Sequence, residues 1–209
     1  PMRTVTRTFN RFHLMTEERT QQGDCIKIVS TEYHAQEASF DDQPPQFQLP
    51  KNVTTRWALA SDATQTRTEV ETTTFDDFGN LTERILANGM RETSSYYPKE
   101  ASDGCPADPE RFVRNLKEKT VYPAESGQGS ATIVRTLNTY QALPDLTSAS
   151  GASDWLVVTE ETLTSSEDNH QAPLQHTQRT YNNEPDKPEL HGRPKSQTET
   201  LNQHTTTTG

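Results

Sequence analysis

The chain has 209 residues and a net charge of −10, and its basic residues are scattered. These features argue against nucleic acid or an anionic membrane surface as a partner, since phosphate contacts require clustered Lys and Arg. No apolar run approaches the roughly 18 residues of a membrane-spanning helix, and the first residues lack the apolar region of a signal peptide. Leu, Ile, Val and Phe form only about 16% of the chain, which excludes a thick core, whereas 32 threonines and 15 aromatic residues favour a sheet with one covered and one wet face.

Strands are predicted wherever apolar and polar residues alternate with a period near two. The clearest are TRTEVETTTF (66–75), SATIVRTLNTY (130–140) and DWLVVTEETLT (154–164). Alternation is already present in the first residues, which leaves open that the chain is part of a longer protein. Loops rich in Gly, Pro, Asp and Asn are predicted at 41–52, 96–110, 122–130, 141–154 and 165–175.

One short helix competes with a strand in the middle of the chain. Asp108 is a candidate cap, Pro109 suits the first helical position, and Phe112, Val113 and Leu116 recur at helical spacing. The alternative is a strand over 113–121 that joins the sheet. We therefore expect residues 99–120 to form a long loop or a helix of two or three turns.

An internal repeat is the strongest organisational signal. A first copy starts at Phe9 and a second at Phe75, and a third, degenerate copy has Tyr181 in the aromatic position. We predict one segment over 1–209 with repeat units near 3–35, 66–98 and 131–209, each built from an aromatic strand, a turn, a polar strand, a Gly turn and a Thr or Tyr strand. Asn88-Gly89 favours a tight hairpin. The matched positions are Phe9 with Phe75, Phe12 with Phe78, Thr16-Glu17 with Thr82-Glu83, and Gly23 with Gly89, and Gly192 lies in the turn of the third copy.

The second copy, FDDFGNLTERILANGMRETSSYYP (75–98), resembles the tyrosine-aspartate (YD) repeat of Rhs proteins. The usual form is Tyr-Asp, two residues, Gly-Asn-Leu, a Gly turn and a closing Thr-x-Tyr. Phe75 replaces the Tyr, and the closing Thr93 and Tyr96 are spaced one residue wider. The positions that fit are Asp76, Gly79, Asn80, Leu81 and Gly89.

Four longer segments, 9–34, 49–81, 96–124 and 190–202, resemble in the same order the Rhs-containing part of the B subunit of insecticidal Tc toxin complexes, a lineage shared with SpvB-like toxin proteins. The run GCPADPERFVRNLK (104–117) is the most specific element, since a plain Rhs protein would not be expected to carry it. The resemblance covers nearly the whole chain.

This resemblance implies an all-β fold, a curved antiparallel sheet of stacked YD-repeat hairpins that forms part of a hollow shell. In that family the B and C subunits enclose a cytotoxic polypeptide, and a pore-forming A subunit delivers it. The implied partners are neighbouring Rhs repeats, the C subunit, the enclosed polypeptide and, indirectly, the A subunit. The implied location is outside the bacterium, with no cofactor. This sequence shows no DPxGxxD-like self-cleavage signature, no propeller and no toxin domain.

The residues themselves give little support for catalysis. Neighbours in a strand face opposite ways, so the pairs Asp41-Asp42 and Asp76-Asp77 suit turns better than acid-base chemistry or calcium binding. Ser102, Asp103 and Cys105 could be grouped with His34 or His170 as a nucleophile constellation, but no strained nucleophile elbow is present. We predict no enzymatic activity.

The two cysteines, Cys25 and Cys105, are too few for a disulfide scaffold. A single bridge between them stays open, and a buried or half-buried thiol is the favoured interpretation. The chain has six histidines, and none of them shows the paired spacing of a zinc site, so no metal is predicted. They are His13, His34, His170, His176, His191 and His204.

A second hypothesis is an adhesive module that recognises a surface protein or glycan through the loops at Gln36–Asn52 and Pro98–Pro109. Phe75, Phe78, Tyr96 and Tyr97 would then stack on sugars, although packing between neighbouring hairpins is the favoured use of these rings. Open sheet edges predict self-association or marginal stability for the isolated chain.

Overall fold

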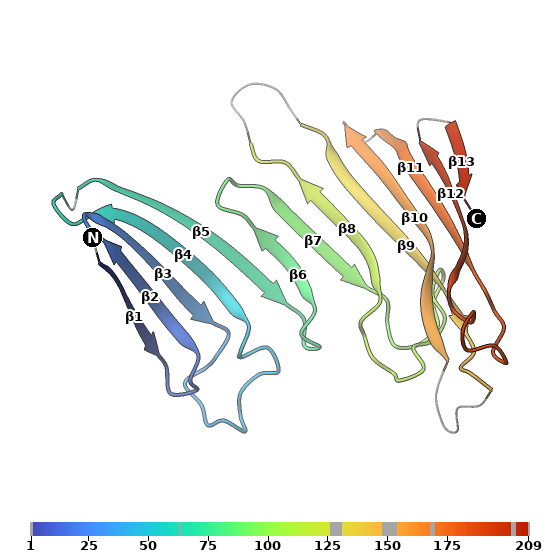
Figure 1. Cartoon of the computed structure of the whole chain (residues 1–209), viewed down its shortest axis with the longest axis horizontal. Coiled ribbons are helices and arrows are strands. Elements are labelled where there is room, and N and C mark those ends of the chain that lie inside the picture. The colour runs from blue at the N-terminus through green and yellow to red at the C-terminus, as the bar shows by residue number, and fades with distance from the viewer. Residues whose placement is uncertain are drawn as a thin grey trace. The chain divides into compact units, whose positions relative to one another are not determined.

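The computed structural model describes residues 2–62, 64–125, 131–147, 154–167, 170–201 and 204–208. Within these ranges the secondary structure consists of strands without helices, so the predicted all-β fold class is confirmed (Figure 1). Hydrogen-bonded neighbours follow the order of the chain. The strands are β1 (Arg3–Phe9), β2 (Met15–Gln22), β3 (Cys25–Tyr33), β4 (Pro50–Leu59), β5 (Thr66–Phe75), β6 (Leu81–Ile85), β7 (Arg91–Tyr96), β8 (Leu116–Tyr122), β9 (Ile133–Leu143), β10 (Trp155–Glu167), β11 (His170–Tyr181), β12 (Pro194–Leu201) and β13 (His204–Thr208).

The chain forms two compact units, Pro1–Glu92 and Thr93–Gly209, and the division falls inside β7. Unit 1 contains β1 to β6, and each of these strands pairs antiparallel with the next. Unit 2 contains β8 to β13, which pair in the same way. The second predicted repeat unit, near 66–98, spans the division.

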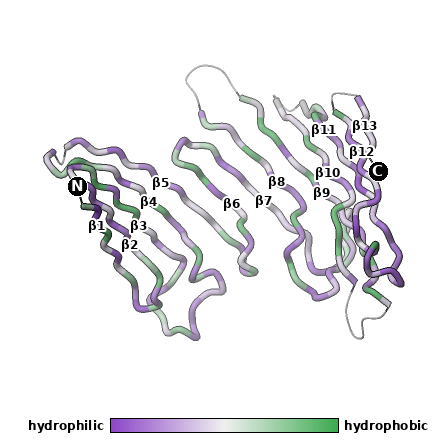
Figure 2. The backbone as a smooth tube through the Cα atoms, viewed as in Figure 1, coloured by the Kyte–Doolittle hydropathy of each residue, from purple (hydrophilic) through white to green (hydrophobic). Residues whose placement is uncertain are grey.

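Side chains are thinly covered in both units, as the low content of large apolar residues predicts. No described residue of unit 1 is fully buried, so the covered face expected from the composition is not found there. In unit 2 the buried apolar residues are Tyr97, Cys105, Leu143 and Val157. Figure 2 shows hydrophobic and hydrophilic positions in short alternating pieces along the strands. Backbone ladders and cross-strand pairs, with a small core in unit 2, therefore hold the fold together.

The strands predicted at 66–75, 130–140 and 154–164 are confirmed as β5, β9 and β10. The loop predicted at 165–175 is wrong, because β10 runs to Glu167 and β11 starts at His170. Pro173, one of the residues that favour a loop there, lies within β11. It pairs with Thr164 of β10, directly beside the register shift at Leu163/Thr164. Proline is tolerated in strands at such irregularities, where it need not donate to the ladder.

The helix proposed for 108–120 is wrong, and the competing strand is right in part, since β8 covers Leu116–Tyr122. The Asp108 carboxylate accepts the N–H groups of Glu110 and Phe112, at 3.0 and 3.1 Å, as a helix cap would. However, Arg111 has φ +60°, a left-handed conformation that cannot continue a right-handed helix. The cap residue thus closes a turn instead.

Candidate functional site

The hairpin turn at Asp76 has a geometry set by its sequence. Asp76 N–H donates to Asn80 O at 2.9 Å and Gly79 N–H donates to Asp76 O at 3.1 Å, which closes a three-residue loop between β5 and β6. The Asp76 carboxylate accepts the N–H groups of Phe78 and Asn80. Gly79, the last loop residue, has φ +82°. This pattern is a type I turn followed by a left-handed residue, a common hairpin connection.

The first repeat copy makes the same turn without glycine. Asn10 N–H donates to Leu14 O and His13 N–H donates to Asn10 O, at 2.9 and 3.0 Å. The Asn10 side chain accepts the N–H groups of Phe12 and Leu14, and His13 has φ +59°. Asn10 and His13 were missed by sequence reasoning, although both fall at the offsets of Asp76 and Gly79.

The sequence match of Gly23 with Gly89 does not extend to turn type. Gly89 N–H donates to Leu86 O and Leu86 N–H to Met90 O, both at 2.8 Å, so Gly89 ends a three-residue loop like that of Gly79. By contrast, Gln22 pairs with Cys25, so Gly23, with φ +58°, is the first residue of a two-residue loop. The two glycines serve different connections at the same sequence offset.

The third copy repeats the Asp76 closure with a longer loop. Gly192 N–H donates to Asn182 O at 2.8 Å and Asn182 N–H donates to Arg193 O at 3.0 Å. Gly192 has φ +74° and is therefore the structural counterpart of Gly79. Tyr181, the predicted aromatic of this copy, immediately precedes Asn182, just as Phe75 precedes Asp76.

A β-bulge or register shift lies directly before each of the aromatic residues that end these strands. The shifts fall at Thr8/Phe9, Thr74/Phe75 and Thr180/Tyr181, and also at Glu32/Tyr33.

Packing of the repeat aromatics is uneven. Phe75 contacts the ring of His34 edge-on at 5.7 Å, Tyr96 is half-buried, and Phe9 and Phe78 are 57% and 65% exposed. The packing expected between hairpins is therefore not found for Phe78.

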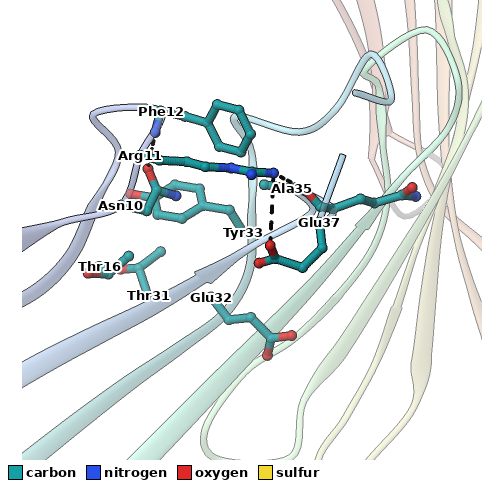
Figure 3. Close-up of a pocket in the computed structure, with 10 residues that line it drawn as sticks. Asn10, Arg11, Phe12, Thr16, Thr31, Glu32, Tyr33, Ala35 and Glu37 are labelled. Atoms are coloured by element: carbon teal, nitrogen blue, oxygen red, sulfur yellow. Dashed lines mark hydrogen bonds and ion pairs between the residues drawn. The ribbon is translucent and has the colours of Figure 1, made fainter. Parts of the chain in front are cut away.

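A cleft of about 560 Å³ lies beside the Asn10 turn in unit 1. Figure 3 shows the Arg11 side chain extending along one side of this cleft, near Phe12 and Glu37. Arg11 donates to the carbonyl oxygens of Gln36 and Ala38 at 3.2 and 2.5 Å, and its guanidinium lies 4.7 Å from the centre of the Phe12 ring. Tyr33, another lining residue, donates its hydroxyl to Met15 O at 2.9 Å.

Two acidic residues of this cleft have basic partners: Lys51 lies 3.1 Å from Glu32, and Arg11 lies 3.9 Å from Glu37. Hydrogen bonds from Asn52 and Lys51 hold the pKa of Glu32 below its ordinary value. The loop that follows β3 covers Phe12 with Phe47, at a ring distance of 5.6 Å, and Phe47 contacts Phe40 at the same distance. Charged, amide, hydroxyl and aromatic groups therefore line the cleft, a set that can recognise ligands by ion pairs, hydrogen bonds and ring contact.

A second cluster surrounds Cys105 in unit 2. The Tyr97 hydroxyl donates to Asn138 O at 2.9 Å, and the ring meets that of Tyr140 edge-on at 5.8 Å. Burial, followed by the nearby Asp108 charge, raises the pKa of the Cys105 thiol. Burial, Cys105 and Tyr97 raise the pKa of Tyr140 to about 12. A thiol that stays protonated is a poor nucleophile, so the cluster has the chemistry of a core.

Asp108 lies next to this cluster with its side chain fully covered. Besides the turn N–H groups, it accepts hydrogen bonds from Arg114 Nε at 2.8 Å and Asn115 Nδ2 at 3.2 Å. Burial alone would raise its pKa, but the hydrogen bonds from Phe112 and Arg114 and the charge of Arg114 outweigh burial and lower it. The most specific segment of the sequence, 104–117, thus contains a buried anion that fixes a loop.

Among the proposed nucleophile residues, Ser102 and Cys105 are neighbours, but no described contact joins either of them to His34. Ser102 and Cys105 exchange two backbone hydrogen bonds, at 2.9 and 3.0 Å. His34 contacts Thr73 O and Phe75 within unit 1, and the side chain of His170 lies outside the described residues. Asp76 serves its turn, as predicted, and Asp42 accepts the Ser39 hydroxyl at 2.6 Å in a loop.

Both cysteines are free; Cys105 is buried as expected, whereas Cys25 is exposed, which corrects the prediction for that thiol. Within the described ranges, no three His, Cys, Asp or Glu side chains converge as a possible metal site. The same part of the chain contains no helix long and apolar enough to cross a membrane.

No protein-family model matches the chain, and no curated protein matches it significantly.

Proposed function

We propose that the chain is a structural segment of the wall of a secreted bacterial Rhs-repeat toxin complex. In this role it encloses a toxic polypeptide together with the C subunit, receives the pore-forming A subunit only indirectly, and performs no catalysis of its own. The observation that carries the proposal is the common closure at Asn10, Asp76 and Asn182. At each site an Asx residue after a strand-ending aromatic is closed by a residue with positive φ.

The strand boundaries support the same repeat. The ends of β1 and β5, the starts of β2 and β6, and the starts of β3 and β7 are each 66 positions apart. A unit of this kind leaves large apolar side chains such as Phe9 and Phe78 exposed, so its stability would depend on neighbouring units, as in other repeat proteins. Stacking of the hairpins into a curved wall stays a prediction of this proposal.

Protection of the enclosed polypeptide tests the proposal directly. The natural gene product that contains this sequence is purified together with its partner subunit, and trypsin resistance of the enclosed polypeptide is followed over time. We expect resistance in the wild type and rapid digestion in Asp108→Ala, which loosens a fixed loop of the wall. The matched control Asp77→Ala, at an exposed hairpin position, retains protection. Equal digestion in all three proteins, or the absence of a protected polypeptide, contradicts the shell role.

The cleft beside Arg11 favours a second candidate, an adhesive module. Phe12 and Tyr33 combine aromatic surface with the polar Asn10, Thr31 and Gln36, a combination that suits a glycan or a polar peptide. A labelled chain would then bind cell surfaces, and Thr31→Arg, which fills the cleft, would abolish that binding. Binding that persists in Thr31→Arg excludes this cleft as the adhesive site.

A further inference from the structure

The turn between β6 and β7 places an asparagine directly before a glycine. Asn88 is followed by Gly89, whereas every other asparagine of the sequence precedes a larger residue. Both residues of the pair are exposed. Because glycine has no side chain, nothing shields its backbone nitrogen from the side chain that precedes it. The turn therefore combines a side-chain amide with an unhindered backbone nitrogen.

Hydrogen bonds hold this pair in a closed loop of three residues. Gly89 N–H donates to Leu86 O and Leu86 N–H donates to Met90 O, both at 2.8 Å. The Asn88 side-chain oxygen accepts Met90 N–H at 3.0 Å, which draws electron density from the amide carbon Cγ. None of the described contacts holds the Asn88 amide nitrogen Nδ2. The amide is thus activated for attack, while the Gly89 nitrogen is occupied as long as the loop is closed.

We propose that Asn88 is a site of spontaneous deamidation that proceeds through the opened β6–β7 turn. The Gly89 nitrogen gives up its proton and forms a bond to Asn88 Cγ. The Cγ–Nδ2 bond then breaks, and Nδ2 takes up a proton and leaves as ammonia. Water opens the resulting cyclic imide at one of its two carbonyl groups, which yields aspartate or isoaspartate. Water is the only other reactant.

The closing hydrogen bonds control the rate of this reaction. Gly89 N–H has to leave Leu86 O before its nitrogen can reach Cγ, so only the open fraction of the turn reacts. Exposed turns open at a lower free energy than the whole protein, and such openings occur in the native state. The modification therefore proceeds slowly in the folded chain and faster once the turn is unfolded.

The two products affect the hairpin differently. Aspartate keeps the main chain at its original length and retains an oxygen for Met90 N–H, while adding one negative charge at neutral pH. Isoaspartate adds an extra carbon to the main chain between residue 88 and Gly89. A lengthened loop no longer fits both closing bonds, so isoaspartate loosens the hairpin. The inference goes beyond the proposed shell role and is independent of it, because it follows from this turn alone.

Mass spectrometry of the aged chain tests the site. The intact chain is incubated at mildly alkaline pH, with and without enough urea to unfold it, and is digested with trypsin at intervals. Cleavage after Arg84 and Arg91 yields peptide 85–91, in which Asn88 is the only residue with a side-chain amide. Peptide 68–84 is the internal control, since its only such residue is Asn80, which precedes Leu81 in the neighbouring turn.

Conversion is expected in one of the two peptides. Peptide 85–91 should gain the mass difference between an amide and a carboxyl group and separate into two chromatographic forms, aspartate and isoaspartate. Peptide 68–84 should stay unchanged, because the Leu81 side chain hinders attack by its backbone nitrogen. Conversion of peptide 85–91 should be about tenfold or more faster in urea, since the closed turn is open for only a small part of the time.

A stability measurement separates the two products. The variant Asn88→Asp reproduces the aspartate form and should unfold in urea at the same midpoint as the wild type. Ion-exchange chromatography of the aged chain provides the isoaspartate form, which should unfold at a lower midpoint. Circular dichroism follows both transitions, and the matched charge of the two proteins leaves the extra main-chain carbon as their only difference.

Every outcome decides the proposal. Conversion that is confined to peptide 85–91 and accelerated by urea supports it. Equal conversion of the two peptides overturns it, as does an unchanged peptide 85–91 in the folded chain or a rate that urea does not raise. An isoaspartate form as stable as Asn88→Asp overturns the predicted loosening of the hairpin. Because both peptides come from the same molecules, their comparison does not depend on the folding of any variant.

Discussion

The turns at Gly79 in unit 1 and Gly192 in unit 2 have the same closing hydrogen bonds but different surroundings. A Cβ atom added to Gly79 would meet nothing within 4 Å, whereas one added to Gly192 would lie 2.2 Å from Cζ2 of Trp155. Local backbone chemistry therefore suffices for the first turn, and the second is also fixed by packing. The comparison teaches that one sequence signal can produce either a free-standing or a packed connection.

The aspartates show the same contrast. Asp76 and Asp108 each accept N–H groups two and four residues later, and each precedes a positive φ at the third residue. Asp76 closes a hairpin at the surface of unit 1. Asp108 is buried in unit 2 and also binds the side chains of Arg114 and Asn115. The contrast predicts much larger effects of substitution in unit 2.

The largest effect is expected for Asp108→Ala. The substitution leaves the N–H groups of Glu110 and Phe112 and the Asn115 amide without their acceptor, and should lower the free energy of unfolding by about 3 kcal/mol. The matched change Asp76→Ala, in a more exposed turn, should cost about 1 kcal/mol. Urea denaturation followed by circular dichroism measures both. Equal losses would remove the distinction between packed and free-standing turns.

Gly192→Ala should destabilise unit 2 by about 2 kcal/mol. The left-handed backbone costs an alanine roughly 1 kcal/mol, and the Trp155 ring must move away from the new methyl group. Thermal denaturation, with Trp155 fluorescence as a local probe, should show both a lower Tm and an altered emission spectrum. An unchanged spectrum would contradict the contact between this turn and the ring.

Acid should weaken unit 2 through Asp108. Its pKa is lower in the folded protein than the ordinary Asp value of about 3.9, so its contribution is complete above that value. The contribution is lost as the pH falls through the lower, folded-state pKa. The stability difference between wild type and Asp108→Asn should accordingly be constant from pH 5 to 7 and shrink below about pH 4. A difference that grows in acid would contradict the depressed pKa.

Gly79→Ala should cost about 1 kcal/mol, only the backbone part of the Gly192 effect, because no neighbouring atom obstructs the methyl group. Comparing the two Gly→Ala variants in the same urea series isolates the packing contribution of Trp155. If Gly79→Ala is as costly as Gly192→Ala, then the surroundings of the turn do not matter.

The smallest effect is a gain. His13 has φ +59° in the first turn, so His13→Gly should raise the free energy of unfolding by about 0.5 kcal/mol by relieving backbone strain. His13→Ala keeps the strained conformation and serves as the control. A loss of stability in His13→Gly would mean that the imidazole contributes more than the strain costs.

Much of the fold follows from the sequence because threonine-rich alternation and Asx-plus-Gly turns are local signals. Phe75, Asp76 and Gly79 mark the second hairpin correctly for this reason. The same local logic left a helix at 108–120 and a strand as equal alternatives: the Asp108 carboxylate does accept N–H groups as a cap would, but Arg111 adopts a left-handed φ that cannot continue a helix. Pro173 favoured a loop in the sequence, because the register shift that accommodates it in β11 is visible only in its pairing with β10.

The Arg11 cleft and the strand register were not predictable, because each depends on residues far apart in the chain. Arg11 meets the carbonyl oxygens of Gln36 and Ala38 only through the path of the loop after β3. The placement of Val53 opposite Glu71 and of Trp57 opposite Arg67 requires the pairing register of β4 and β5. Nor did the sequence indicate that Gly192 corresponds to Gly79, since the connecting loop in the third copy is longer.

The bulge before Phe75 also fixes the register of β5 against β6. Thr72, Thr73 and Thr74 are chemically identical, so nothing in their side chains distinguishes one alignment of β5 against β6 from an alignment displaced by a single step. The irregularity at Thr74/Phe75 acts as a fixed stop, because any displacement would have to rebuild it together with the adjoining turn. A monotonous run of threonines can therefore encode a unique alignment, provided that one irregular residue marks where the ladder ends.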